Sequence, residues 1–341
     1  MRHLLELDPE ARRARVQPGL VLDRLREAAE RHGLTFAPDP ATHSRCTLGG
    51  MIGNNSCGVH SIYGGKTVDN LAALEVLLYD GTRLRLGAGA PAACAGRAGA
   101  LYAGLRGLVD GCGDEVRQGF PRLPRRVSGY NLDQLLPENG FHLARALVGS
   151  EGTCATVLEA TLDLRPSPPS RVLVGAGFSD VATAADHVPE VLLRRPIGLE
   201  GLDGLLLDYM RRKRLLLRDL ELIPAGRGTL LIEFGDWDPG AAAAAADGCA
   251  HWLRTQGAAV RVYSAAEAAR VWHVRESGLG ATAFVPGRPH GWEGWEDAAV
   301  APDRLGHYLR EFAQLMAGFG YQAPMYGHFG DGCVHMRIDF D

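Results

Sequence analysis

The sequence predicts an α+β protein of two domains, and three observations support this prediction. The chain has 341 residues, which is longer than a single hydrophobic core usually serves. Hydrophobic residues make up 46% and charged residues 22% of it, as in folded globular proteins. The polar run "RPSPPSR" at Arg165–Arg171 carries three prolines and is typical of a linker. We therefore expect one domain over residues 1–166 and a second over residues 171–341.

The first domain is expected to open with a short strand in "ARVQPG" and an amphipathic helix in "LVLDRLREAAERHG" that stops at Gly33. The run "LAALEVLLYDGTRLRLG" predicts two strands joined at Asp80-Gly81, because Asp-Gly favours a tight hairpin. A helix is expected near Ala100–Val116. The run "ARALVGSEGTCATVLEATLDLRP" predicts a strand, a glycine turn and a long alternating strand.

The second domain alternates strand and helix patterns. "VLVGAGF" and "TLLIEFG" predict strands, while "LLLDYMRRKRLLLRDL" and "PGAAAAAADGCAHWLRTQG" predict helices. "CVHMRIDFD" predicts a strand that is still in progress at the last residue. The first residues also lie inside what resembles a fold, so we expect the sequence to be a fragment.

Composition and cysteine usage exclude several classes of protein. The formal net charge of -4 leaves no basic field, which argues against a nucleic-acid partner. No apolar run is long enough for a membrane span, and the N-terminus lacks the apolar core of a signal peptide. The seven cysteines include no C-x-x-C pair, so a disulfide framework, a zinc ribbon and a ferredoxin-type cluster are unsupported. We expect a cytoplasmic protein, at most peripheral to the inner face of the membrane.

The glycine-rich stretch Gly49–Lys66, "GGMIGNNSCGVHSIYGGK", is the first candidate binding segment. A P-loop would need a glycine where His60 stands, and no apolar strand leads into it. A Rossmann turn needs the spacing G-x-G-x-x-G, which this stretch lacks. Glycines bring main-chain N–H groups close to a ligand, but a tortuous buried turn that needs positive φ would use them equally well. The residues alone leave a binding role and a purely structural role open.

Longer segments resemble a known family. "PDPATHSRCTLGGMIGNNSCGVHSIYGGKTVDNLAALEVLLYDGT" resembles the second flavin-contact segment of the vanillyl-alcohol-oxidase/PCMH-type flavoproteins. "SGYNLDQLLPENGFHLARALVGSEGTCATVLEATL" resembles their next segment, while "VWHVRESGLGATA" and "YGHFGDGCVHMRIDFD" resemble their second domain. The resemblance runs nearly end to end. Within the family, the sequence resembles FAD-linked D-2-hydroxy-acid dehydrogenases of the D-lactate dehydrogenase, D-2-hydroxyglutarate dehydrogenase and glycolate oxidase type.

The resemblance implies a partial PCMH-type FAD-binding domain over residues 1–166, truncated at its N-terminus. A partial α+β FAD-linked oxidase C-terminal cap domain would follow over residues 171–341, truncated at its C-terminus. The family's first flavin loop would precede Met1, and an iron–sulfur cluster would belong to a C-terminal region outside this sequence. The resemblance also implies the residues that contact FAD, which are Pro38, Asp39, Thr47, Gly49, Gly50, Gly53, Asn54, Asn55, Cys57, Gly58, Glu151, Gly152 and Val157.

A second candidate site is "HFGDGCVH", His328–His335. In the expected strand, alternate residues from Val334 share an apolar face, and His335 points to the other face. His328 precedes a glycine turn and can fold back beside His335, so the pair could bind a metal or serve as structural histidines. By resemblance, the motif H-x-G-D-G-x-x-H supplies two ligands, His328 and His335, to a divalent, zinc-like ion. A Glu-His element beyond Asp341 would supply the third ligand and the general base.

Arg275, in "WHVRESG", resembles the arginine that binds the substrate carboxylate in this family, and a guanidinium fork can grip a carboxylate at two points. Composition alone favours a helix-surface arginine paired with Glu267 or Glu276. Dicarboxylate-specific members of the family carry a threonine where Leu279 stands and a lysine that the region around Trp295 lacks. This difference weakens a prediction of 2-hydroxyglutarate as substrate.

The resulting hypothesis is an FAD-dependent oxidoreductase that oxidises a D-2-hydroxy acid, of the D-lactate or D-2-hydroxyglutarate class, to the 2-oxo acid. Arg275 would hold the carboxylate, a metal at His328 and His335 would lower the pKa of the hydroxyl, and flavin N5 would accept the hydride. Electrons would pass to an iron–sulfur protein or a quinone chain. Two alternatives stay open: a non-catalytic truncated remnant that retains no flavin, and a metal-dependent hydrolase that uses His328, Asp331 and His335.

Overall fold

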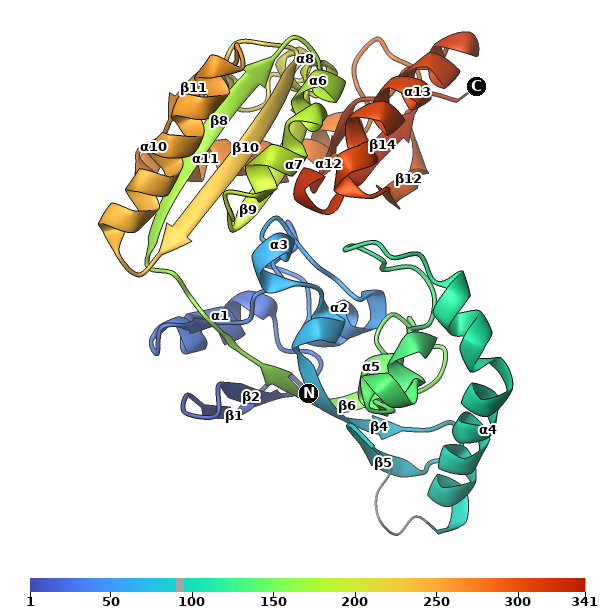
Figure 1. Cartoon of the computed structure of the whole chain (residues 1–341). Helices are drawn as coiled ribbons and strands as arrows, with labels where there is room; N and C mark the ends of the chain where they lie inside the picture. The colour runs from blue at the N-terminus through green and yellow to red at the C-terminus, as the bar shows by residue number, and fades with distance from the viewer. Residues whose placement is uncertain (90–94, 341) are drawn as a thin grey trace. The chain divides into compact units, whose positions relative to one another are not determined.

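The structure, a computed structural model, describes residues 1–89 and 95–340, and these form two compact units (Figure 1). Unit 1 comprises residues 1–58, 64–122 and 126–167; unit 2 comprises residues 59–63, 123–125 and the chain from Pro168 onward. The two short segments of unit 2 come from sequence that we assigned to the first domain. Cys94 lies outside the described residues. Within the described ranges, no helix combines the length and apolar character needed to cross a bilayer.

Unit 1 is built on a five-stranded antiparallel sheet with the strand order β1, β2, β6, β4, β5. The strands are β1 Leu4–Asp8, β2 Arg13–Val16, β4 Leu71–Leu77, β5 Arg83–Leu86 and β6 Thr156–Asp163. The predicted hairpin is confirmed, since Leu74 on β4 lies opposite Leu86 on β5. In its turn Gly81 has φ 84°, a value that glycine adopts without strain.

One face of the unit 1 sheet packs on helices, and the other carries charged side chains, as the alternation along a strand requires. Ala14, Leu74 and Ala160 belong to the buried core, together with residues of four helices. These helices are α1 Leu22–Glu30, α2 Leu48–Asn54, α4 Gly96–Gly119 and α5 Leu143–Ala146. On the opposite face, Arg15 Nη1 lies 2.8 Å from Glu159 Oε2. The core of unit 1 therefore lies on one side of its sheet.

One predicted strand of unit 1 is wrong, because "ARALVG" forms helix α5 and a turn. His142 caps this helix, since its Nδ1 accepts a hydrogen bond from Arg145 N at 3.2 Å. The long strand predicted after it is confirmed as β6. The smaller elements of this part of the chain are β3 Leu34–Thr35, β7 Arg165–Pro166, α3 Ser61–Gly64, η1 Thr67–Asn70, η2 Leu132–Leu135 and η3 Pro137–Asn139.

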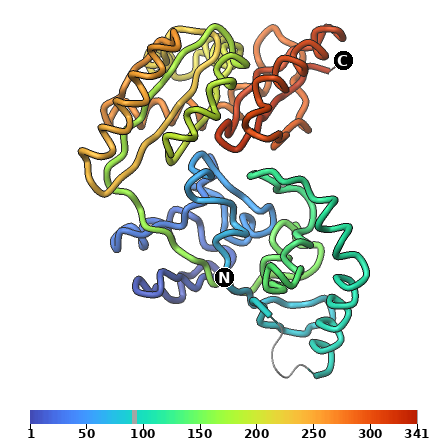
Figure 2. Tube along the Cα trace, in the orientation of Figure 1, coloured from blue at the N-terminus to red at the C-terminus, as the bar shows by residue number. Residues whose placement is uncertain are grey.

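Unit 2 is built on a seven-stranded sheet with the strand order β11, β8, β10, β9, β13, β14, β12. The strands are β8 Ser170–Phe178, β9 Gly198–Asp203, β10 Gly228–Asp236, β11 Ala259–Val262, β12 Trp292–Ala299, β13 Met325–Gly327 and β14 Cys333–Ile338. All of its pairs are antiparallel. β8 and β10 run side by side with α10 along them (Figures 1 and 2). The strands predicted in "VLVGAGF", "TLLIEFG" and "CVHMRIDFD" are confirmed.

Helices cover both faces of the unit 2 sheet. Leu230 and Ile232 pack with helices on one face, whereas Leu231, between them, packs with helices on the other. The first face carries α6 Val181–Asp186, α7 Val188–Leu192, α10 Pro239–Thr255 and α13 Leu305–Gly318. The second carries α8 Gly204–Arg212, α9 Leu217–Leu220, α11 Ala265–Glu276 and α12 Gly278–Thr282. With antiparallel sheets and packed helices in both units, the predicted α+β class is confirmed.

One predicted helix of unit 2 is divided in two. The run "LLLDYMRRKRLLLRDL" contains Arg214 with φ 55° and Leu216 with φ 50°, and these left-handed residues separate α8 from α9. Two short 3₁₀ helices, η4 Pro302–Arg304 and η5 Phe329–Asp331, complete the unit. The second of them forms the turn between β13 and β14, where the two candidate histidines lie.

Candidate functional site

The glycine-rich segment begins as helix α2 and not as an extended loop. Thr47 caps the helix, and its Oγ1 accepts a hydrogen bond from Gly50 N at 3.3 Å. Met51 and Ile52 are buried in the core of unit 1, which offsets the low helix propensity of the glycines. The helix ends at Asn55, which has φ 52°. Within Gly49–Lys66, positive φ therefore occurs at Asn55 and, with a value of 67°, at Gly65.

Among the predicted FAD-contact glycines of this segment, some are required by close packing and others are not. At Gly49 a Cβ atom would lie 2.6 Å from Pro18 Cβ, and at Gly58 it would overlap the backbone of Asp39. Close packing of unit 1 thus explains both positions without a ligand. At Gly53 the nearest atom to an added Cβ would be Glu151 Cα at 3.7 Å, an ordinary contact. Packing does not require glycine there.

A cavity of about 450 Å³ opens on the glycine side of α2. Two backbone hydrogen bonds join its walls: Gly149 N donates to Ile52 O at 2.9 Å, and Glu151 N donates to Gly53 O at 3.1 Å. None of the lining residues carries a charged side chain. They are Met1, Pro18, Gly19, Thr47, Gly49, Gly50, Ile52, Gly53, Val76, Leu147, Ser150, Gly152, Ala155, Thr156 and Val157. The structure therefore brings together two segments that are about a hundred residues apart in the chain.

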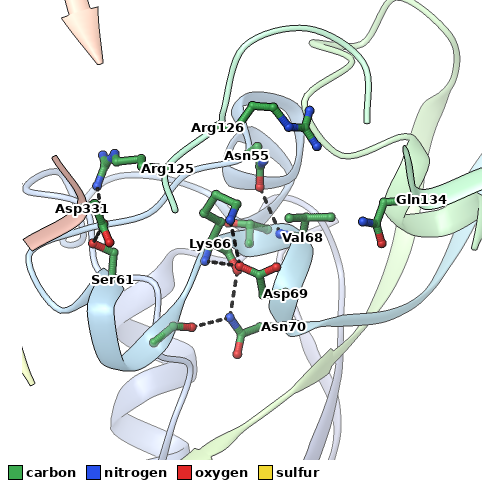
Figure 3. A network of polar contacts seen from close by, with 12 residues as sticks. Asn55, Ser61, Lys66, Val68, Asp69, Asn70, Arg125, Arg126, Gln134 and Asp331 are labelled. Carbon is green, nitrogen blue, oxygen red and sulfur yellow. Dashed lines mark hydrogen bonds and ion pairs between the residues drawn. The ribbon is translucent and has the colours of Figure 1, made fainter. Parts of the chain in front are cut away.

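The other predicted FAD-contact residues are not among the residues that line this cavity: Pro38, Asp39, Asn54, Asn55, Cys57, Gly58 and Glu151. Asn55 is fully buried, and its Oδ1 accepts a hydrogen bond from Val68 N at 3.0 Å (Figure 3). Its Nδ2 has no hydrogen-bond partner among the described residues. Sequence reasoning missed the lining residues Pro18 and Gly19, although their Pro-Gly turn was visible as a strand end.

The two candidate histidines of unit 2 are brought together by the turn between β13 and β14. His328 precedes η5, and His335 lies on β14 opposite Tyr326 of β13. Gly332 closes the turn with φ 69°, and a Cβ atom there would overlap Val300 O. The ring centroids of His328 and His335 are 5.1 Å apart, with the ring planes at 89°. The predicted convergence of the two imidazoles is confirmed.

Asp297 of β12 joins the two histidines, and sequence reasoning missed it. One ligand atom from each of Asp297, His328 and His335 lies within 4.8 Å of the others. Asp297 Oδ1 also accepts a hydrogen bond from Arg125 Nε at 3.0 Å. Burial alone would raise the pKa of Asp297, but Arg125 and His335 hold it below its ordinary value, so the carboxylate is ionised.

Asp331, which the hydrolase alternative would use, has different surroundings. Its Oδ2 accepts a short hydrogen bond from Ser61 Oγ and lies 4.0 Å from Arg125 Nη1 (Figure 3). Among the described residues, the acidic group that clusters with His328 and His335 is Asp297. The metal-binding set therefore consists of Asp297, His328 and His335, and does not contain Asp331 as the hydrolase alternative expects.

Arg275 is buried at the end of α11, so the alternative of a helix-surface arginine is wrong. It is 4% exposed, and its Nε lies 2.7 Å from Glu200 Oε2. Glu267, one of the expected partners, caps α11 at Ser264 and pairs with Arg261 instead. The ion pair of Arg275 therefore belongs to the interior of unit 2.

Glu200 of β9 connects Arg275 with His328, whose Nδ1 lies 2.9 Å from Glu200 Oε1. Burial raises the pKa of Glu200 to about 8, while the positive charges of Arg275 and Arg125 oppose this rise. Burial and the same two arginines lower the pKa of His328 well below its ordinary value. This low pKa favours the neutral imidazole, the form that binds metals. The sequence offers no local signal for Glu200, which lies 128 residues before His328.

Comparisons with known proteins match the two parts of the chain separately. A family model described as FAD binding domain matches residues 1–87, and one described as FAD linked oxidases, C-terminal domain, matches residues 167–341. D-2-hydroxyglutarate dehydrogenase of Pseudomonas putida is 32% identical over all of this chain and 36% of its own length. Glycolate oxidase subunit GlcD of Bacillus subtilis is 28% identical over all of this chain and 62% of its own length.

Two further comparisons agree with these. D-lactate dehydrogenase of Archaeoglobus fulgidus is 28% identical over 98% of this chain and 62% of its own length. A solved structure of alkyldihydroxyacetonephosphate synthase superposes with a TM-score of 0.63 at 15% identity, over 99% of this chain and 60% of that one, which shows a shared fold. The chain spans 36% of the length of the Pseudomonas putida relative. From the two matched domains, found in this order on one chain, it follows that the chain belongs to the PCMH-type family of FAD-linked oxidases.

Proposed function

We propose that this protein takes part in the FAD-dependent oxidation of a D-2-hydroxy acid to the 2-oxo acid. The observation that carries the proposal is one buried cluster of unit 2, in which Glu200 contacts both Arg275 and His328. An arginine suited to a carboxylate and a histidine suited to a metal thus share one partner. The names of the relatives favour an enzyme over a remnant that has lost its flavin.

The cavity of unit 1 fits a flavin. Its volume lies within the range of about 300–1,000 Å³ that small-molecule sites usually have. Gly50, Gly53 and Gly152 expose main-chain atoms to it, and its uncharged lining suits a flat, largely apolar ring system. Asn55 does not line the cavity but caps helix α2, which does, and its buried Nδ2 has no hydrogen-bond partner among the described residues. We assign this cavity to part of an FAD molecule, whose bound form supplies the hydride acceptor for the reaction.

The cluster of unit 2 fits a hydroxy acid and a divalent metal. Two imidazoles and a carboxylate, from His328, His335 and Asp297, form a donor set that zinc accepts. They would hold a metal that polarises the substrate hydroxyl and lowers its pKa. Arg275 would bind the substrate carboxylate and fix its orientation. Burial of His328 and Arg275 strengthens their electrostatic contacts.

The substrate class is a small D-2-hydroxy acid. The relatives named D-2-hydroxyglutarate dehydrogenase favour a dicarboxylate, but Leu279 replaces the threonine of the family pattern and is 48% exposed. Reduced FAD must pass its electrons onward, and we infer an iron–sulfur protein or a quinone chain as acceptor. The metal, the acceptor and a cytoplasmic location belong to this proposal.

An anaerobic titration tests the function. Purified protein that carries FAD is mixed with D-lactate, D-2-hydroxyglutarate or their L-enantiomers. The flavin absorbance at about 450 nm should bleach with a D-acid and stay unchanged with the L-acids. Protein that retains FAD but bleaches with no D-2-hydroxy acid would contradict the proposal.

A further inference from the structure

We propose that Glu200 is a positioning residue that sets the tautomer of His328 and the orientation of Arg275 together, and so couples metal binding to carboxylate recognition. The inference rests on the proposed function for the roles of its two partners. The Glu200 side chain is 1% exposed, and its two oxygens serve different residues. Oε1 lies 2.9 Å from His328 Nδ1, while Oε2 lies 2.7 Å from Arg275 Nε and 2.6 Å from Arg275 Nη2.

The contact with Oε1 decides which nitrogen of His328 is available to a metal. Arg275 Nε donates to Oε2, and the arginine charge favours the ionised form of Glu200. Above about pH 8 the carboxylate therefore only accepts hydrogen bonds, and Nδ1 must carry the ring hydrogen. A neutral His328 then presents an unprotonated Nε2, which is the form in which imidazole becomes a ligand. Glu200 thus prepares a metal ligand without touching the metal itself.

The contacts with Oε2 leave part of Arg275 for a ligand. The guanidinium has five N–H donors; Glu200 accepts a hydrogen bond from Nε, and Nη2 forms an ion pair with the same oxygen. The remaining donors, on Nη1 and Nη2, are not engaged by Glu200 and can bind an incoming carboxylate. Tyr326 lies against the same guanidinium, with its ring centroid 5.2 Å from Arg275 Cζ. Because arginine is a permanent cation, it gives the buried Glu200 a charge partner.

A glutamine at position 200 could accept a hydrogen bond from only one of the two partners, His328 or Arg275. Both His328 Nδ1–H and Arg275 are donors, but an amide has only one acceptor oxygen. If that oxygen faces Arg275, the amide NH₂ faces Nδ1 and moves the ring hydrogen to Nε2, which blocks metal ligation. If the oxygen faces His328, the NH₂ opposes the donors of Arg275. Either orientation breaks the coupling.

A matched control lies on the neighbouring strand. Glu233 of β10 is also buried, with its side chain 6% exposed, and it contacts His60 and Trp272 instead of the metal-binding set. Glu233→Gln therefore removes a buried negative charge from the same sheet. The comparison of Glu200→Gln with Glu233→Gln separates the positioning of His328 from a general loss of stability.

The test measures Zn²⁺ affinity by competition with a chromogenic chelator for the wild-type protein, Glu200→Gln and Glu233→Gln. Thermal unfolding checks that each protein is folded. We expect Glu233→Gln to bind Zn²⁺ like the wild type and Glu200→Gln to bind it about 10- to 100-fold more weakly. Equal affinity of folded Glu200→Gln and wild type would overturn this inference alone. Failure of the wild type to bind Zn²⁺ would overturn the proposed metal site and, with it, the metal-positioning role.

A second measurement needs no folded Glu200 variant. In metal-free wild-type protein at about pH 9, where Glu200 is ionised, ¹⁵N NMR of the imidazole of His328 identifies its tautomer. The signal is assigned by its loss in His328→Asn. We expect the Nδ1–H tautomer that Glu200 imposes. An Nε2–H tautomer would overturn the inference even if Glu200→Gln fails to fold.

Discussion

Glu233 Oε2 lies 2.8 Å from His60 Nε2, in a pair whose side chains are 6% and 14% exposed. Trp272 Nε1 donates a hydrogen bond to the other carboxylate oxygen at 2.9 Å. Burial alone would raise the pKa of Glu233, but His60, Arg171 and Trp272 together hold it below its ordinary value. A carboxylate with a lowered folded-state pKa stabilises the protein above its unfolded-state pKa. This contribution is lost as the pH falls through the folded-state pKa.

We expect Glu233→Gln to lower the free energy of unfolding by about 1–3 kcal/mol at neutral pH. The difference from wild type should shrink as the pH falls below about 4, where the carboxylate of the wild type becomes protonated. Urea unfolding at both pH values measures it. Glu311→Gln is the control, because Glu311 pairs with His307 at 3.4 Å on the surface and should change little. A difference that does not vary with pH would contradict the role of the Glu233 charge.

Two glycines of α2 should respond in opposite ways to alanine. Gly49→Ala places a methyl group against Pro18, so we expect a loss of about 1–3 kcal/mol of stability. Gly53→Ala has room for the methyl group and replaces a helix-interior glycine, so its stability should be equal or higher. Because Gly53 lines the cavity, this variant should retain less FAD. Thermal unfolding and the FAD released on denaturation measure the two effects, and full FAD retention by Gly53→Ala would contradict the flavin assignment.

Arg275→Lys tests carboxylate binding. A lysine keeps the positive charge but lacks the planar fork, so we expect kcat/KM for the hydroxy acid to fall about 10- to 100-fold. Arg270→Lys is the control, because Arg270 lies on the same helix, is exposed, and pairs with Asp219 at 2.7 Å. Steady-state kinetics of the FAD-loaded proteins give kcat/KM for each variant and for the wild type. Equal losses in the two variants would show that Arg275 has no special place in substrate binding.

Removal of the metal should affect the proposed metal site of unit 2 and leave the proposed flavin cavity of unit 1 unchanged. Dialysis against a chelator, or His335→Ala, should abolish oxidation of the hydroxy acid and leave the FAD content unchanged, because the proposed metal ligands and the cavity belong to different units. His307→Ala, which changes an exposed histidine of α13, should retain metal and activity. Zinc content by elemental analysis accompanies each assay. Full activity of metal-free protein would contradict the proposed role of the metal.

Several features could be predicted from the sequence because their physical causes are local. The Asp80-Gly81 turn, the alternation along β14 and the glycine turn between His328 and His335 each depend on residues within about ten positions. The α2 helix could not be predicted in this way. Its glycines disfavour a helix, and burial of Met51 and Ile52 in the core decides its conformation.

The sequence by itself therefore determined the α+β class, the glycine-rich segment, the histidine pair and Arg275 as candidates. Only the tertiary structure decided which partners they have. Asp297 reaches the histidines because β12 pairs with β14, and Glu200 reaches His328 because β9 pairs with β13. Strand pairing brings together residues that are far apart in the chain, and burial then gives their charges and hydrogen bonds their strength. Neither effect is visible in the spacing of residues along a sequence.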